Sequence, residues 1–220
     1  MLSRITIIIF VASFLFACKK DPAPYFGYEY FPMDEGTYVE YNVMDIVHDE
    51  GGNPQHDTTR YRLRTVVGEV VEDNEGRAAR KLYRYSYDQN NGELLDQRVW
   101  TQLIDGGRAE VIEENQRKIR LVFAITLDKT WDVNAFNPEE ELEVSYDEIF
   151  NPYQEFDSTV TVEYEDFFSL VDYRRKYEVY ANGVGLIKRS FKDLVINNFD
   201  TLDISNGTEV HYELIDYGIE

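Results

Sequence analysis

Cysteine is almost absent from this chain of 220 residues, because Cys18 is the only one. A disulfide needs two cysteines, so the folded part must be held together by packing. Histidine is scarce as well, with three residues, and neither a Gly-x-Ser-x-Gly motif nor a phosphate-binding glycine loop occurs. The sequence therefore predicts a protein that is not an enzyme, with no catalytic residue and no cofactor.

Positive charge is scarce too. The chain has 22 Lys and Arg residues against 42 Asp and Glu residues, which gives a net charge of −20 at pH 7. Such a charge repels phosphate backbones, so nucleic acid is excluded as a partner. Gly/Ser-rich linkers and low-complexity runs are also missing. We therefore expect one folded domain, residues 28–220.

A targeting segment lies at the amino terminus. Arg4 is followed by an apolar run, residues 5–16, which is too short to cross a bilayer but suits the core of a secretory signal. The run leads into Leu15-Phe16-Ala17-Cys18, which resembles the lipobox of bacterial lipoproteins. The resemblance implies a signal peptide, residues 1–17, and a mature chain that begins at an acylated, palmitate-bearing Cys18. Two or three acyl chains give durable attachment, since each buried methylene contributes about 0.8 kcal/mol.

The residues after Cys18 bear on location. Lys19 stands where an aspartate would signal retention at the inner membrane in related lipoproteins, so we expect anchoring at the cell outer membrane. Cys18-Lys19-Lys20-Asp21 also resembles the export tags of some surface lipoproteins, and the sequence leaves the periplasmic and the surface face both open. Residues 18–27 form the lipidated terminus and a tether, which reaches only about 20 to 25 Å from Cys18 to Tyr25.

Short runs of alternating apolar and polar residues follow the tether, separated by Gly, Asn and Asp, and this pattern indicates antiparallel strands. The expected strands are 37–47, 59–67, 77–87, 93–104, 109–114, 117–125, 158–168, 171–181, 184–196 and 208–217. Asn137-Pro138-Glu139-Glu140 has the features of a helix start, but Leu142, Val144 and Tyr146 alternate with period two, so we prefer a strand there.

About ten strands without a long helix predict an all-β protein, an antiparallel meander that forms a strongly curved sheet or a barrel. The tyrosine and phenylalanine residues suit half-buried pleated surfaces. Tyr83, Tyr85 and Tyr87 could instead line a ligand cavity, although small barrels more often fill their interiors with side chains.

The sequence "VYANGVGLIKRSF" contains a predicted hairpin turn of type I′ at Asn182-Gly183, in which Val179 faces Leu186 and Tyr180 faces Gly185. The stretch Tyr180 to Lys188 resembles a hallmark of a group of uncharacterised bacterial outer-membrane lipoproteins. So do "YFPMDEGTYVEY", "LDKTWDVNAFN" and the closing "YELIDYG". The resemblance implies an anchored all-β domain and brings no activity, so no catalytic residue is carried over from it.

The histidines in "VHDEGGNPQHD" are the best metal candidates. A turn centred on Gly52 would place His48 and His56 opposite each other across a hairpin, and imidazole with carboxylate suits zinc. A loop tip offers little support for metal ligands, so we interpret the segment as a solvated polar turn and predict no metal site.

A stripe of arginines is a candidate anion contact. Arg60, Arg62 and Arg64 alternate along one predicted strand, and Arg80 and Arg84 join that face if the turn at 73–76 pairs even positions with even. Acids on adjacent strands could neutralise these guanidiniums. Alternatively, the stripe binds an anionic headgroup or polysaccharide, because the planar guanidinium suits phosphate and carboxylate.

Two functions remain open on this basis. We favour a membrane-anchored, non-enzymatic envelope lipoprotein that binds a ligand or an envelope protein partner, or that has a structural role. The alternative is a hydrolase that acts on envelope or imported glycans through Asp/Glu pairs, which would need two opposed carboxylates in a deep cleft, one with a raised pKa.

Overall fold

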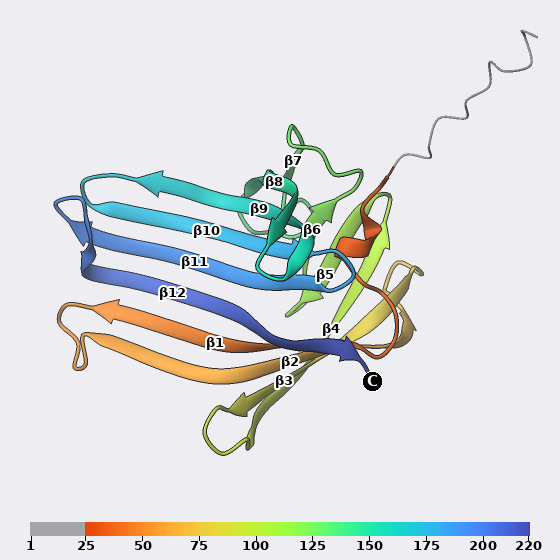
Figure 1. Cartoon of the computed structure of the whole chain (residues 1–220), viewed down its shortest axis with the longest axis horizontal. Helices are drawn as coiled ribbons and strands as arrows, with labels where there is room; N and C mark the ends of the chain where they lie inside the picture. Colours follow the sequence, from red (N-terminus) through yellow and green to blue (C-terminus); the bar gives the residue numbers. More distant parts are fainter. Residues whose placement is uncertain (1–24) are drawn as a thin grey trace, which may run out of the picture.

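The structure is a computed structural model that describes residues 25–220, so the predicted signal peptide, Cys18 and most of the tether lie outside the described residues. The described part is all-β, which confirms the predicted fold class (Figure 1). Among these residues no helix is long and apolar enough to cross a membrane. The elements are η2 (Tyr28–Tyr30), β1 (Thr37–Asp49), β2 (His56–Glu72), β3 (Ala78–Asp88), β4 (Leu94–Asp105), β5 (Arg108–Glu113), β6 (Gln116–Val122), β7 (Thr130–Asp132), β8 (Glu143–Tyr153), β9 (Phe156–Phe168), β10 (Asp172–Ala181), β11 (Gly185–Asn197) and β12 (Asp200–Ile219).

All twelve strands belong to one antiparallel sheet with the order β6-β5-β4-β3-β2-β1-β12-β11-β10-β9-β8-β7. Two meanders, β1 to β6 and β7 to β12, are joined where β1 pairs with β12, for example at Val43 and Tyr212. The outer edges of the meanders also meet, because the Ile119 amide donates a hydrogen bond to the Val133 carbonyl oxygen at 3.0 Å. The sheet is therefore a nearly closed barrel.

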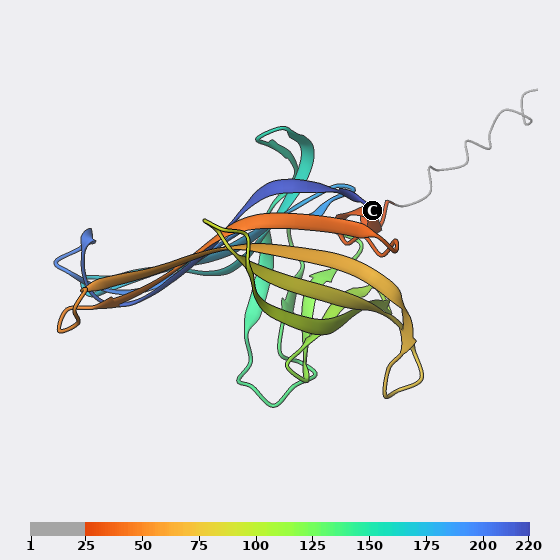
Figure 2. The ribbon, with the colours of Figure 1, turned by 90° about the horizontal axis from the view of Figure 1, so that it is seen from below.

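The strands divide into two regions along their length (Figures 1 and 2). At one end the sheet curls into the barrel, and this part is called the barrel half. At the other end β1, β2, β9, β10, β11 and β12 continue beyond it as a flat extension (Figure 2). This extension is called the flange and comprises residues 44–60, 165–175 and 192–210.

Inward-facing side chains of the strands fill most of the barrel half. Tyr41, Val43 and Leu63 face inward and are each 2% exposed. Their neighbours Glu40 and Arg62 face outward and form an ion pair at 2.8 Å. Because successive side chains of a strand point to opposite faces, this pattern gives the barrel half an apolar lining and a charged outer surface.

The segment around η2 closes one end of the barrel half. Tyr30 is fully buried, and its hydroxyl is hydrogen-bonded to the Ser158 hydroxyl at 2.7 Å. The Gln102 side-chain amide donates to the Pro32 carbonyl oxygen at 3.1 Å, and the Gly183 amide donates to the Glu29 carbonyl oxygen at 2.8 Å. These contacts tie the first described residues to three different strands or turns, so they act as a plug.

The strand that we preferred over a helix is confirmed at Val144 and Tyr146, which lie on β8, whereas residues 137–142 form a loop, since β8 begins only at Glu143. The preceding loop is held by side-chain to backbone hydrogen bonds. The Asn137 side chain donates to the Arg117 carbonyl oxygen at 2.9 Å, and the Asp132 carboxylate accepts a hydrogen bond from the Leu142 amide at 2.9 Å. Such bonds offer the backbone an alternative to a strand ladder, which explains the late start of β8.

The hairpin between β10 and β11 also differs from its prediction. Tyr180 pairs with Leu186 and Ala181 with Gly185, so the loop has three residues rather than two. Gly183 has a positive φ of 75°, whereas Asn182 does not, which excludes a type I′ turn. Gly185 is needed for a close approach, because a Cβ atom there would lie 3.2 Å from Pro32 of the plug.

Candidate ligand-binding cavity

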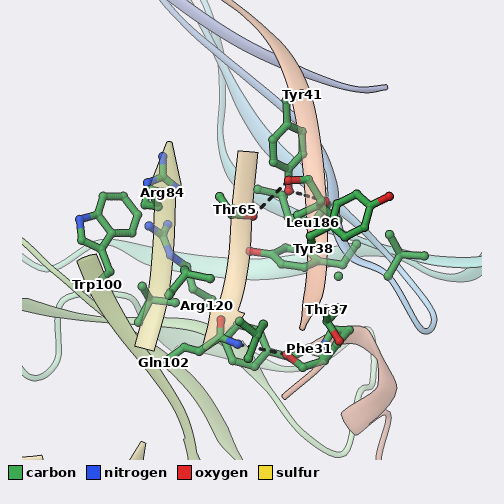
Figure 3. Close-up of a pocket in the computed structure, with 18 of the residues that line it drawn as sticks. Phe31, Thr37, Tyr38, Tyr41, Thr65, Arg84, Trp100, Gln102, Arg120 and Leu186 are labelled. Carbon is green, nitrogen blue, oxygen red and sulfur yellow. Dashed lines mark hydrogen bonds between the residues drawn. The ribbon is translucent and has the colours of Figure 1, made fainter. Parts of the chain in front are cut away.

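A cavity of about 110 Å³ lies inside the barrel half, between β1 to β6 on one side and β10 to β12 on the other (Figure 3). Phe31 and Pro32 of the plug form part of its wall. Three arginines, Arg84, Arg120 and Arg189, contribute to the lining, and no aspartate or glutamate does. In a chain with 42 acidic residues this lining stands apart from the rest of the molecule.

A buried carboxylate holds two of these arginines in place. Glu178 on β10 is fully buried. One of its oxygens accepts a hydrogen bond from Arg189 Nε at 2.7 Å and lies 3.7 Å from Arg120 Nη1. The other oxygen accepts hydrogen bonds from the hydroxyls of Tyr164 at 2.9 Å and Tyr180 at 2.5 Å. Glu178 therefore has a full set of partners, as a buried charge requires.

These partners keep Glu178 ionised. Burial by itself would raise the pKa of the Glu178 carboxyl group. The charges of Arg189 and Arg120 and the tyrosine hydrogen bonds outweigh burial and lower the pKa to about 2. Arg120 also donates to Glu113 at 2.8 Å, and the pKa of Glu113 is lowered in the same way, by Arg120 and Lys118 acting against burial. Both carboxylates thus neutralise guanidiniums and do not act as acids.

Arg84 on β3 is the third arginine, and sequence reasoning placed it on the wrong face. Val70 does pair with Arg80, as the even-with-even register requires. A bulge between Val67 and Val70 then shifts the register, so that Thr65 pairs with Arg84. Arg84 therefore faces the cavity with Thr65, opposite to Arg60, Arg62 and Arg64. Its guanidinium carbon lies 3.8 Å from the centroid of the Trp100 ring (Figure 3).

The other arginines of the predicted stripe have mostly acidic neighbours. Arg62 and Arg64 both pair with Glu40, at 2.8 and 3.1 Å, and Arg64 also pairs with Glu220 at 2.8 Å. Arg80 pairs with Glu35 at 3.0 Å. Arg60 lies at Met44, with its Nη2 atom 3.4 Å from the sulfur. The prediction that five guanidiniums share one face is therefore wrong, because Arg80 shares the face of β3 that carries Arg84. Carboxylates pair with three of the five guanidiniums.

The tyrosine ladder lies outside the cavity. Tyr83 and Tyr85 stack with ring centroids 6.3 Å apart, and Tyr85 and Tyr87 follow at 6.5 Å. They alternate with the inward-facing Leu82 and Arg84, so they lie on the outer face of β3. The Tyr83 ring also covers Gly68 at the bulge, where a Cβ atom would lie 2.5 Å from the ring.

His48 and His56 stand opposite each other, as the turn centred on Gly52 predicted. Their Nδ1 atoms lie 2.8 Å apart. Sequence reasoning missed the rest of the cluster: Glu209 on β12 lies 3.0 Å from His48 Nε2 and 2.8 Å from His211 Nε2. His48 and His211 thus meet at one carboxylate, and His56 joins this cluster through His48. Within residues 25–220 no group of three or more His, Cys, Asp or Glu side chains has a geometry that could hold a metal ion.

Carboxyl groups with a raised pKa lie elsewhere. Burial raises the pKa of Asp45, which lies on β1 within the flange. Burial also raises the pKa of Glu163 on β9, against the opposing charge of Arg175. Neither residue lines the cavity. The cavity therefore offers cationic and hydrogen-bonding groups, and the carboxylates behind its lining, Glu178 and Glu113, are ionised and paired.

Comparisons with known proteins add little to this site. The chain matches no protein-family model. It also matches none of the curated proteins. Among solved structures it is similar to the crystal structure of "a putative lipoprotein from Parabacteroides distasonis", with 13% sequence identity and a TM-score of 0.40 over 84% of this chain and 98% of that one. At this level the likeness carries no argument about ligand or activity, and the resemblance of the Cys18 segment to a lipobox stays a prediction.

Proposed function

We propose that this protein is a non-enzymatic lipoprotein of the cell envelope that binds a small ligand inside its barrel half. The cavity lined by three arginines and no acid is the observation that supports ligand binding. The alternative, a glycan hydrolase, requires a carboxylic acid with a raised pKa opposite a carboxylate. Glu178 and Glu113 both have lowered pKa values, so the cavity lacks the acid that this reaction needs.

The proposed anchor is Cys18, and the proposed location is the outer membrane. Leu15-Phe16-Ala17-Cys18 supports the anchor, and Lys19 supports the outer membrane. The tether between Cys18 and Tyr25 is short, and Tyr25 leads directly into the plug. The barrel half would therefore lie close to the lipid, with the flange directed away from it.

Fatty-acid labelling of the full chain tests the anchor. We expect the wild type to take up label and to remain with membranes, and Cys18→Ser to lose both properties. Retention of label by the serine variant would overturn the assignment. An outer-membrane fraction that contains the wild type supports the location, and an inner-membrane fraction contradicts it.

A cavity-filling variant tests ligand binding. Val111 lines the cavity, and Val99 on the neighbouring strand β4 is 50% exposed. Native mass spectrometry of the full chain purified from its host should detect a bound small molecule in the wild type and in the control Val99→Phe. Val111→Phe should lack it. A wild-type protein that is empty after purification and whose unfolding midpoint no small molecule raises would contradict the proposal.

A further inference from the structure

The interior of the barrel half has an excess of positive charge. Three guanidiniums line the cavity, and two carboxylates, Glu178 and Glu113, lie directly behind the lining. Arg189 is paired with Glu178, and Arg120 is paired with Glu113 and lies near Glu178. These pairings balance two of the three charges. One positive charge, on Arg84, remains without a counterion.

Arg84 has no carboxylate partner among residues 25–220, and its main contact is the face of Trp100. An aromatic face fixes the guanidinium plane but leaves its N–H donors free at the edge. Burial lowers the pKa of Arg84, and nearby Tyr212 counters this effect in part. Arg84 is half-buried, and even partial burial of a charge without a carboxylate partner costs free energy, so an anion that reached Arg84 would be stabilised.

The volume of the cavity and the side chains of its wall restrict which anion can bind. Beside the arginines, the cavity is lined by apolar side chains such as Val39, Leu82, Val111 and Leu186, and by hydroxyl groups such as that of Thr65. An apolar cavity of about 150 Å³ accepts benzene, so one of about 110 Å³ takes a ligand with only a few heavy atoms. A polyanion such as phosphate would bring more negative charge than the one unbalanced guanidinium can offset. A single carboxylate matches the excess of one positive charge and the fork of one guanidinium.

We infer that the cavity binds a short-chain monocarboxylate, with its carboxylate on Arg84 and its hydrocarbon part against Leu82, Val111 and Leu186. The inference rests on the proposed ligand-binding function and names the ligand class. Arg84, Trp100 and Tyr212 lie together in the wall of the site, with Tyr212 close enough to Arg84 to affect its pKa. The paired Arg120 and Arg189 add positive potential without competing for Arg84.

Titration of the full chain in detergent with acetate, propionate and butyrate tests the inference. Acetamide, propionamide and butyramide serve as neutral isosteres, phosphate serves as a polyanion, and sodium chloride holds the ionic strength constant. Isothermal titration calorimetry gives the affinities. We expect at least one monocarboxylate to bind at least tenfold more tightly than its amide and than phosphate.

Two variants sharpen the test. Arg84→Gln keeps hydrogen-bond donors and removes the charge, so carboxylate affinity should fall at least tenfold. The matched control Arg62→Gln alters an arginine on the outer face of the neighbouring strand, where it pairs with Glu40, and should leave affinity unchanged. Arg84→Gln should also raise the unfolding midpoint of the ligand-free protein, because it removes a charge without a counterion. A lower midpoint would indicate that Arg84 has a structural partner and would overturn the inference.

The outcomes separate the inference from the proposed function. Equal binding of carboxylates and amides, with no effect of Arg84→Gln, overturns the anionic ligand but keeps a ligand-binding cavity. Preferential binding of phosphate overturns the monocarboxylate class. Binding of a purified endogenous molecule that carries no carboxylate does the same. If neither these probes nor an endogenous molecule binds, the proposed function fails as well.

Discussion

The barrel half and the flange are built from the same strands but differ in what covers their faces. In the barrel half the inward side of β1 and β2 is apolar, with Tyr41, Val43 and Leu63 each 2% exposed. Further along β1 the same side presents Asp45 and then Val47, which is 54% exposed. The flange has no second layer opposite it (Figure 2), and most of its side chains are half-buried or exposed, with Leu194 and Ile196 as buried apolar exceptions.

Strand pairing and core formation are therefore separate sources of stability in this protein. Hydrogen bonds between β1 and β2 continue without interruption from the barrel half to the tip of the flange, as the pairing of Val43 with Tyr61 and of His48 with His56 illustrates. Burial does not continue in the same way. Regions with few buried apolar contacts open at lower free energy than the core. We therefore expect the flange to exchange its amide protons faster than the barrel half.

Removing the central carboxylate should produce the largest loss of stability, and the experiment compares a buried with an exposed carboxylate of the barrel half. Glu178→Ala leaves Arg120 and Arg189 buried without their shared counterion, and we expect a loss of about 3 to 5 kcal/mol in the free energy of unfolding. Urea denaturation measures it. Glu213→Ala is a control, since Glu213 pairs with Lys188 at a half-exposed site and should cost at most about 1 kcal/mol. Equal losses would contradict the comparison.

Truncating one apolar side chain in each region should give the next largest contrast. Leu63→Ala opens a cavity in the barrel half and should cost about 2 to 4 kcal/mol. Val47→Ala alters the same sheet face in the flange and should change stability by less than about 0.5 kcal/mol. Chemical denaturation of both variants measures the contrast. A loss above about 2 kcal/mol for Val47→Ala would show that the flange is covered by a partner in solution.

Acid should weaken both regions in the same pH range. A hydrogen bond from His211 is the largest cause that lowers the pKa of Glu209 in the flange, and Lys192 and His48 add to it against burial, so the pKa is about 2. Glu178 also has a pKa of about 2. Because both values lie below the ordinary 4.5, their stabilisation is complete above pH 4.5 and is lost as the pH falls through 2, by up to about 3 kcal/mol each.

Hydrogen exchange measured between pH 5 and pH 2.5 shows whether the flange or the barrel half loses its stability first. We expect amides of 44–60 and 192–210 to lose protection before those of the barrel half, since the flange starts from a lower local stability. Simultaneous loss in both regions would indicate that they unfold as one cooperative unit. A stability that rises as the pH falls from 4.5 would contradict the assigned pKa directions.

The smallest effect concerns the β10–β11 loop at the plugged end of the barrel half. Gly183 has a φ of 75° and open space around its missing Cβ atom, so Gly183→Val adds backbone strain without a clash and should cost about 1 to 3 kcal/mol. Asn182→Ala should cost less than about 0.5 kcal/mol, because Asn182 has an ordinary φ. Thermal denaturation of both variants measures these costs. Equal costs would favour the type I′ turn that the sequence suggested.

Local patterns predicted most of the fold. Alternation of apolar and polar residues located ten of the strands, and the polar turn at Gly52 correctly set His48 opposite His56. The same reasoning failed where one residue changes the register. Gly68 permits a bulge because the Tyr83 ring occupies the space of a Cβ atom, and this bulge turns Arg84 from the outer face to the cavity.

Long-range pairing was also beyond prediction from the sequence. Nothing local in β12 indicates that Glu209 and His211 will meet His48, or that Glu178 will meet Arg120 from the other meander. These contacts arise from the order of strands around the barrel. The loop at 134–142 shows a third limit, because Asn137 and Asp132 form hydrogen bonds with the backbone that compete with a strand ladder.

The junction between β1 and β12 has a consequence for how the chain folds. Every other strand pair joins neighbours in the sequence, so each meander has a low contact order and can form by itself. β1 and β12 come from opposite ends of the domain, and their pairing must wait until the last strand is present. A chain that emerges amino-terminus first therefore holds β1 as an unpaired edge until Tyr212 and its neighbours arrive. That final pairing closes the barrel and would be the rate-limiting step of folding.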